Sequence, residues 1–311
     1  MIAEARPARK RRRSRSKIPA RVAGNLAAMF SVDFRDGLVT LSDSEAPSAA
    51  VLAPARGGIL RELSVAGRDL LYLDRATFDD PAANVRGGVP VLLPSPGKLA
   101  GDAWSWGGAR GAMKQHGFAR NLPWSVAGTG TGDGAWATLV LEANEATRAQ
   151  FPWEIRAAYT YRLRGRAIAI EMRVENRGGT PMPFGAGFHP YFAVRDADKA
   201  AARIATAATR AFDNVMKKDV AFTGFDLTAA EVDLHLYDHG STASSLSAGD
   251  LAVSVRGSAE LGHWVVWTLR GRDFVCLEPW TCPGNALNTG DRLIVLGPGE
   301  AREMRLEIAR A

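Results

Sequence analysis

Histidine and carboxylate side chains supply most of the acid–base chemistry open to this chain. Its 311 residues include five histidines, which are His116, His189, His235, His239 and His263. Imidazole titrates close to neutral pH, so a histidine near a carboxylate can give or take a proton under ordinary conditions. The local sequence around each of these groups indicates which of them could have a chemical role.

Glu278 lies in the segment VCLEPW, directly after an apolar run and before Pro279 and Trp280. Carboxylates rarely enter such apolar surroundings unless they are paired. A neighbouring indole also suits a sugar, because its apolar face can stack on the ring. The segment therefore predicts either a functional carboxylate or a strand-end residue that faces solvent.

His189 and His116 have contrasting settings. His189 lies in GAGFHPYF, where aromatic neighbours and Pro190 predict a rigid and partly apolar environment. Such an environment lowers the imidazole pKa unless a carboxylate opposes it, and a nearby acid would suit it to proton donation. His116 lies in KQHGFARNLPW with Arg120 and Trp124 nearby, a set that suits a polyol. The alternatives are a buried histidine bonded to backbone and a structural loop histidine.

The sequence holds no HExxH, CxxC or Asp-rich calcium loop, so it predicts no metal site. The segment GGVPVLLPSPGKL is neither a P-loop nor a dinucleotide-binding fingerprint, and no GxSxG elbow is present. We therefore expect acid–base chemistry by His and Glu without a cofactor.

The elements that must position these groups are strands. In residues 167–175, Ile168, Ile170, Met172 and Val174 alternate with more polar residues, which is typical of a half-buried strand. Gly165 is expected to mark a hairpin before it. Helical patterns are scarce: residues 228–236 fit a short helix or a strand, and residues 197–211 are ambiguous. We predict an all-β fold with few short helices, a single large antiparallel β-sandwich domain over residues 25–311.

The net charge of +6 comes from the N-terminus. Residues 1–21 hold nine Lys or Arg and one acid, which leaves −2 on the remaining chain. A body of that charge does not favour nucleic-acid binding. Residues 1–24 are predicted to be a disordered basic tail. This tail is interpreted as an extension from an upstream start codon, an electrostatic tether to nucleic acid or acidic lipid, or a targeting peptide.

Cys276 and Cys282 are the two cysteines, and a disulfide between them would need a sharp reversal within CLEPWTC. Two such thiols without a secretory signal favour a cytoplasmic location. No apolar run approaches the roughly 20 residues of a membrane span.

Five motifs in order resemble the aldose 1-epimerase superfamily, the galactose-mutarotase-like enzymes. They are RGGVPVLLPSPGKL (86–99), QHGFARNLPW (115–124), GFHPYF (187–192), VVW (265–267) and VCLEPWTCPGNALNTG (275–290). The resemblance runs from about residue 30 to the C-terminus and implies a large antiparallel β-sandwich, the galactose mutarotase-like supersandwich, with an open cleft.

The resemblance also implies roles. Glu278 would be the general base, His189 the general acid, and His116 a residue that hydrogen-bonds the sugar. Asp238, in LYDHG, resembles the family aspartate that contacts sugar hydroxyls, and Asp213, in AFDN, competes for that role. Such a site would interconvert the α and β anomers of a sugar by opening and closing its ring.

Two substrate classes follow from the resemblance. The segment LLPSPGKL is closer to the branch that acts on free aldoses, and on that basis a free aldohexose is expected. RGGxP followed by HGFAR resembles the hexose-6-phosphate branch, in which Arg86 and Arg120 would hold the phosphate bidentately. The alternative for Arg86 is a structural ion pair with a carboxylate. Other functions left open are a non-catalytic sugar binder, a sugar hydrolase or lyase, and nucleic-acid binding by the tail.

Overall fold

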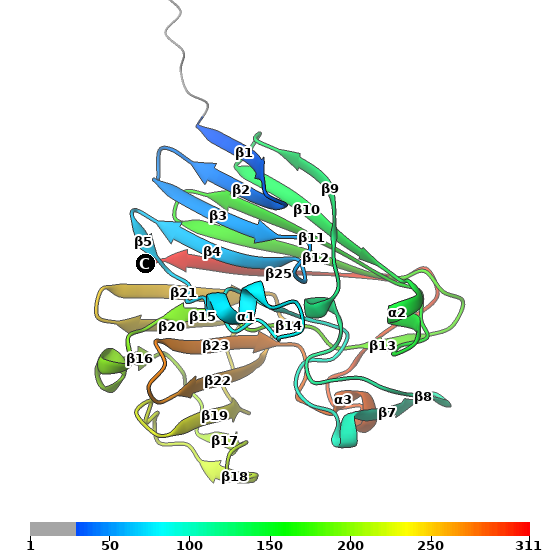
Figure 1. The fold of residues 1–311 in the computed structure, drawn as a ribbon. Helices are drawn as coiled ribbons and strands as arrows, with labels where there is room; N and C mark the ends of the chain where they lie inside the picture. Colours follow the sequence, from blue (N-terminus) through cyan, green and yellow to red (C-terminus); the bar gives the residue numbers. More distant parts are fainter. Residues whose placement is uncertain (1–28) are drawn as a thin grey trace, which may run out of the picture.

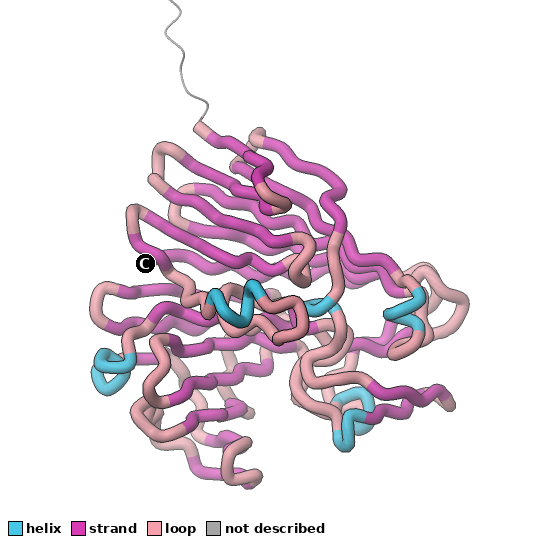
Figure 2. Tube along the Cα trace, viewed as in Figure 1, coloured by secondary structure: helices cyan, strands magenta, loops and turns pink. Residues whose placement is uncertain are grey.

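The computed structural model describes residues 29–311, so the predicted tail over residues 1–24 lies outside the described residues. Strands dominate it and the helices are few and short (Figures 1 and 2), which confirms the predicted all-β class. None of the helices described for residues 29–311 has the length and apolar character that a membrane span requires.

A five-stranded sheet forms the N-terminal part of the described chain (blue in Figure 1). Its strands, in spatial order, are β1 (Phe30–Arg35), β2 (Leu38–Asp43), β3 (Ser48–Ala53), β4 (Ile59–Val65) and β5 (Arg68–Asp69). Strands β1 to β3 contact β9 to β11 of a second sheet, so the two sheets form a sandwich.

That second sheet, which we call the β12 sheet, has eight strands. Their spatial order is β16 (Arg203–Ile204), β20 (Ala243–Ala248), β21 (Leu251–Gly257), β25 (Ala301–Arg310), β12 (Ala167–Asn176), β11 (Ile155–Arg164), β10 (Ala135–Glu142) and β9 (Ser125–Gly130). The predicted alternation holds in β12, where Ile168, Ile170, Met172 and Val174 are all buried. Gly165, with φ +59°, makes the hairpin between β11 and β12.

A third sheet, which we call the β23 sheet, also has eight strands, seven of them along its main path. Their order is β18 (Lys218–Ala221), β17 (Arg210–Asp213), β19 (Glu231–Leu236), β22 (His263–Leu269), β23 (Phe274–Trp280), β14 (Gly187–Phe188) and β6 (Val91–Leu92), with β15 (Tyr191–Ala193) pairing β23 beside β14. Residues 228–236, which fit either a helix or a strand, form β19. Leu234 and Leu236 lie on one face of that strand, and Asp233 and His235 lie on the other.

The remaining elements are short. Two further sheets have two strands each: β7 (Ala103–Trp106) pairs with β8 (Ala109–Ala112), and β13 (Met182–Phe184) pairs with β24 (Ile294–Leu296). The α-helices are α1 (Arg75–Asp79), α2 (Glu145–Arg148) and α3 (Ala286–Thr289), and 3₁₀ turns span Ala100–Asp102, Ala119–Asn121 and Asp196–Ala201. One continuous apolar core joins residues of all three large sheets, and the single domain over residues 25–311 stays a prediction.

Candidate active site

Strand β23 presents two different faces. Val275 and Leu277 point into the continuous core, whereas Cys276, Glu278 and Trp280 lie on the opposite face. Strand pairing extends this second face sideways: Val265 of β22 lies opposite Glu278, and Tyr191 of β15 lies opposite Cys276. This face of the β23 sheet carries the candidate site.

Glu278 and His189 meet there. His189 lies between β14 and β15, and its Nε2 is 3.4 Å from Oε1 of Glu278. Both residues are buried, Glu278 to 1 % exposure. The indole Nε1 of Trp280 donates to the other carboxylate oxygen, Oε2, at 3.2 Å. The Tyr191 ring stacks on the His189 ring at 4.7 Å and fixes its plane.

Burial shifts the pKa values of this pair in opposite directions. It raises the pKa of Glu278 well above its usual value, an effect to which Asp233 adds, while Trp280 and Arg120 oppose it. Burial lowers the pKa of His189 to about 3, and Asp233 partly opposes that shift. The buried pair therefore carries one exchangeable proton, which burial favours on Glu278 when the site is empty.

A tight loop brings His116 to the same place. His116 has φ +70° and Gly117 has φ +75°, and a Cβ added to Gly117 would lie 2.1 Å from the carbonyl oxygen of Leu93. The His116 ring consequently lies 5.5 Å from the ring of His189 and 5.7 Å from that of Trp280.

The hydrogen bonds of His116 determine which of its ring nitrogens carries the proton. The Gly97 N–H donates to Nδ1 at 3.1 Å, so a neutral ring must carry its proton on Nε2. The Gln115 amide 3.2 Å from Nε2 must then present its oxygen. Burial, together with the charge of Arg120, lowers the pKa of His116 well below its usual value. His116 is thus a neutral ring whose Nε2–H donates to Gln115, and the hydroxyl of a bound molecule could replace Gln115 as the acceptor.

Arg120 and Arg86 supply positive charge to this face. Arg120 donates to the Gln115 carbonyl at 3.2 Å, and its buried Nε has no hydrogen-bond partner among the residues that the structure describes. The charges of both arginines act on Tyr191, the neighbour of His189. Within residues 29–311, neither guanidinium has a carboxylate within 4.0 Å, so the ion pair considered for Arg86 is not formed.

The aspartate on this face is Asp233, which the sequence analysis missed. It lies on β19 opposite Trp267, which lies opposite Cys276, so it shares the face of Glu278. Its charge acts on both Glu278 and His189. The alternation DLHL was the available signal, because it places Asp233 and His235 on one face and the leucines on the other.

The two aspartates singled out from the sequence serve the backbone instead. Asp238 accepts from the Thr209 N–H, the Thr209 hydroxyl and the Arg210 N–H, at 2.9, 2.6 and 3.0 Å. Asp213 accepts the N–H groups of Val215 and Met216 and holds the β17–β18 turn. The sugar-contacting role of Asp238 or Asp213 stays a prediction, and Asp233 is a further candidate on the face of Glu278.

His235 and His263 also belong to this face. Nδ1 of His235 is 2.9 Å from Nε2 of His263, and both rings pack against Trp280. His239, in contrast, is buried against Trp264 and bonds Thr206 and the Ala243 carbonyl.

Donor atoms of His189, Cys276 and Glu278 lie within 4.8 Å of one another, so a soft metal ion could be held there. Such an ion would occupy the lone pairs that proton transfer at this pair requires. Cys276 and Cys282 are both buried free thiols.

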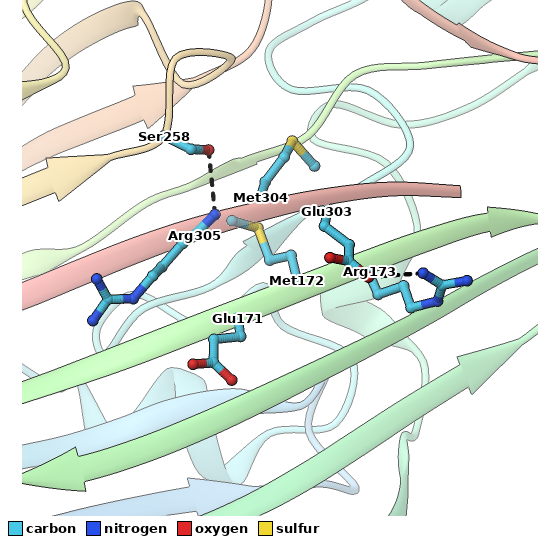
Figure 3. Close-up of a pocket in the computed structure, with 7 residues that line it drawn as sticks. All are labelled: Glu171, Met172, Arg173, Ser258, Glu303, Met304 and Arg305. Carbon is cyan, nitrogen blue, oxygen red and sulfur yellow. Dashed lines mark hydrogen bonds and ion pairs between the residues drawn. The ribbon is translucent and has the colours of Figure 1, made fainter. Parts of the chain in front are cut away.

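A cavity of about 430 Å³ lies elsewhere, between β12 and β25 (Figure 3). It is lined by Glu171, Met172, Arg173, Ser258, Glu303, Met304 and Arg305. None of these residues belongs to the β23 sheet. Arg173 pairs with Glu303 at 2.8 Å across the strands, so the charges of this lining are already matched. The lining of this cavity carries no histidine–carboxylate pair, so Glu278 and His189 remain the candidate site.

Comparison with known proteins identifies the family of this chain. A sequence profile described as aldose 1-epimerase matches residues 38–309. The chain belongs to the aldose 1-epimerase family. This confirms the resemblance seen in the five motifs, and with it an isomerase of the epimerase type.

The Slr1438 protein of Synechocystis sp. PCC 6803 is 36% identical over 91% of this chain and 99% of its own, with a TM-score of 0.86. A galactose mutarotase-like protein of Clostridium acetobutylicum shares the fold at 18% identity and a TM-score of 0.75, over 91% of this chain and 98% of that one. A protein of Salmonella typhimurium provisionally named glucose-6-phosphate 1-epimerase is 29% identical over 133 residues. That match spans 42% of this chain and 40% of the relative.

Proposed function

We propose that this family member is an aldohexose 1-epimerase in which Glu278 acts as the general base and His189 as the general acid. The observation that carries the proposal is the buried contact of 3.4 Å between His189 Nε2 and Glu278 Oε1. The anomeric hydroxyl oxygen and the ring oxygen of a pyranose are both bonded to C1. An acid and a base this close can therefore reach both oxygens of one sugar.

The reaction follows from the pair. Glu278 takes the proton of the anomeric hydroxyl while His189 Nε2–H protonates the ring oxygen, and the bond between C1 and the ring oxygen breaks. The open aldehyde turns about C1–C2, and the reverse transfers close the ring on the other face. Arg120 favours the ionised form of Glu278 but disfavours protonated His189, and Asp233 does the reverse, so each of these charges stabilises one member of the ion pair that the reaction needs.

His116 and Trp280 support binding. His116 offers a neutral Nε2–H to a hydroxyl, and Trp280 lies within 5.7 Å of its ring. Asp233, with a side chain 21% exposed, offers carboxylate oxygens on the same face. A sugar needs both donors and acceptors around its hydroxyls, and this face supplies both.

The substrate is a free aldohexose, as the LLPSPGKL segment favours, or a hexose 6-phosphate. One specific observation favours the phosphate: Arg86 and Arg120 have no carboxylate partner within residues 29–311. Arg86 is exposed, whereas Arg120 is largely buried, and burial of an uncompensated guanidinium is costly. The provisional name of the partial Salmonella typhimurium relative points the same way.

Polarimetry on freshly dissolved α-D-glucose and α-D-galactose, beside a coupled assay on glucose 6-phosphate, tests both classes. Acceleration of the free sugars supports a free aldose, and Arg86→Gln should then leave KM unchanged. Acceleration confined to the phosphate supports the second class. In that case Arg86→Gln should raise KM about tenfold or more, the size of one charged hydrogen bond. No acceleration of any of these sugars would contradict the epimerase proposal for them.

A further inference from the structure

Three polar side chains form a chain across the face of the β23 sheet that carries Glu278. Nε2 of His235 lies 3.6 Å from Oδ1 of Asp233, and Nδ1 of His235 lies 2.9 Å from Nε2 of His263. The second carboxylate oxygen, Oδ2, accepts from the side-chain amide of Asn214. Asp233 and His235 belong to β19 and His263 to β22, so two paired strands hold the chain in register.

If both imidazole rings are neutral, one pattern of donors and acceptors fits these three side chains. An ionised carboxylate only accepts, so His235 must turn its Nε2–H toward Asp233. Nδ1 of His235 then has a lone pair and must accept, which requires His263 to donate from its Nε2. The direction of donation is therefore His263 to His235 to Asp233, with both tautomers assigned from the network.

The surroundings keep His263 a neutral donor. It is 4% exposed, and burial, His235 and Arg292 together lower its pKa well below the usual value. His235 itself is surrounded by Phe212, Trp280, Asp233 and His263, and its charge would act on His116. Although burial acts to raise the pKa of Asp233, hydrogen bonds from His235 and Asn214, and the charge of Lys217, hold it below its usual value.

We propose that His263 and His235 are positioning residues that hold the Asp233 carboxylate ionised and fixed in orientation beside the Glu278–His189 pair. The inference rests on the proposed function, because Asp233 matters to the reaction through its action on that pair. Neither histidine needs to touch substrate for this role. A buried donor behind a polar group commonly fixes the tautomer and direction of the group in front of it.

The test compares two variants at His263 with a control variant at His239. His263→Phe keeps a ring of similar volume and removes the donor, His263→Gln restores an N–H at nearly the position of Nε2, and His239→Phe is the control. His239 is equally buried, at 3%, but bonds Thr206 and the Ala243 carbonyl. We expect His263→Phe to lower kcat about 2- to 10-fold with little change in KM, the size of one neutral hydrogen bond. His263→Gln should recover most of this loss.

Two readouts separate positioning from general damage. The titration midpoint of the Asp233 carboxyl carbon, followed by ¹³C NMR, should rise in His263→Phe, return in His263→Gln and stay unchanged in His239→Phe. In an Asp233→Asn background, His263→Phe should add less than about a twofold further loss, because the histidines act through Asp233. A full additional loss there, or an unmoved Asp233 midpoint, would overturn the proposal.

Imidazole ¹⁵N shifts of the wild-type protein test the network without any variant, in case His263→Phe does not fold. We expect His235 to be protonated at Nε2 and His263 at Nε2, and a proton on Nδ1 of neutral His235 would overturn the arrangement. If the wild type accelerates no sugar, the proposed function fails by itself. The tautomers and the Asp233 midpoint still decide whether this chain of donors exists.

Discussion

Replacing Glu278 by Gln removes one proton-accepting charge from the site while keeping its shape. The side-chain oxygen of Gln can still accept from Trp280 Nε1, which lies 3.2 Å from Oε2 in the wild type. A positioned general base contributes about 10²–10⁴-fold. We expect kcat/KM to fall by that factor, which corresponds to about 3–5 kcal/mol of transition-state stabilisation.

The same variant should change stability in the opposite direction. Because the folded pKa of Glu278 is raised, its contribution to stability is complete below the unfolded value near 4.5 and is lost as pH rises through the folded value. Gln carries no charge and escapes this loss. Glu278→Gln should therefore have a higher Tm than the wild type at pH 8, and the difference should shrink toward pH 4.

Anomerisation is followed by polarimetry and unfolding by calorimetry at both pH values, on the same protein samples. Glu303→Gln serves as the control, since Glu303 is an exposed surface carboxylate paired with Arg173. Activity within about threefold of wild type would refute the assignment of Glu278 as general base. If the Tm difference between Glu278→Gln and the wild type were smaller at pH 8 than at pH 4, the reasoning that burial opposes the charge of Glu278 would be refuted.

Further predictions concern pH and the His116 loop. The acidic limb of the kcat/KM profile should lie above pH 4.5, because Glu278 must be ionised and its pKa is raised. Asp233→Asn should move that limb to lower pH, because Asp233 raises the pKa of Glu278. Trp280→Phe should move it to higher pH, because the Trp280 N–H lowers the same pKa. A shift of both variants in the same direction would contradict these electrostatic effects. Gly117→Ala should destabilise by about 3 kcal/mol or more in chemical unfolding, from strain at φ +75° and the clash with Leu93. Gly271→Ala, at φ +74° with open space around it, should cost about 1 kcal/mol, and similar losses at both positions would argue against the clash.

The local pattern of the sequence predicted much of the fold. Alternation in residues 167–175 predicted β12 and its buried face, and Gly165 predicted the hairpin before it. Both depend on period-two geometry and turn conformation, which are local properties of the chain. Residues 228–236 remained open between helix and strand, because a short apolar pattern fits either until a neighbouring strand pairs with it.

The sequence by itself also determined which residue types the site contains, since the motifs around Glu278, His189 and His116 were recognisable one by one. Only the tertiary structure placed the three aspartates relative to Glu278. Asp213 and Asp238 accept turn and strand-end N–H groups. The pairing of β19 with β22, and of β22 with β23, aligns Asp233 with Glu278. The lack of a carboxylate beside Arg86 and the contact between His235 and His263 have the same origin. Strand register joins residues far apart in the chain, and no local spacing encodes it.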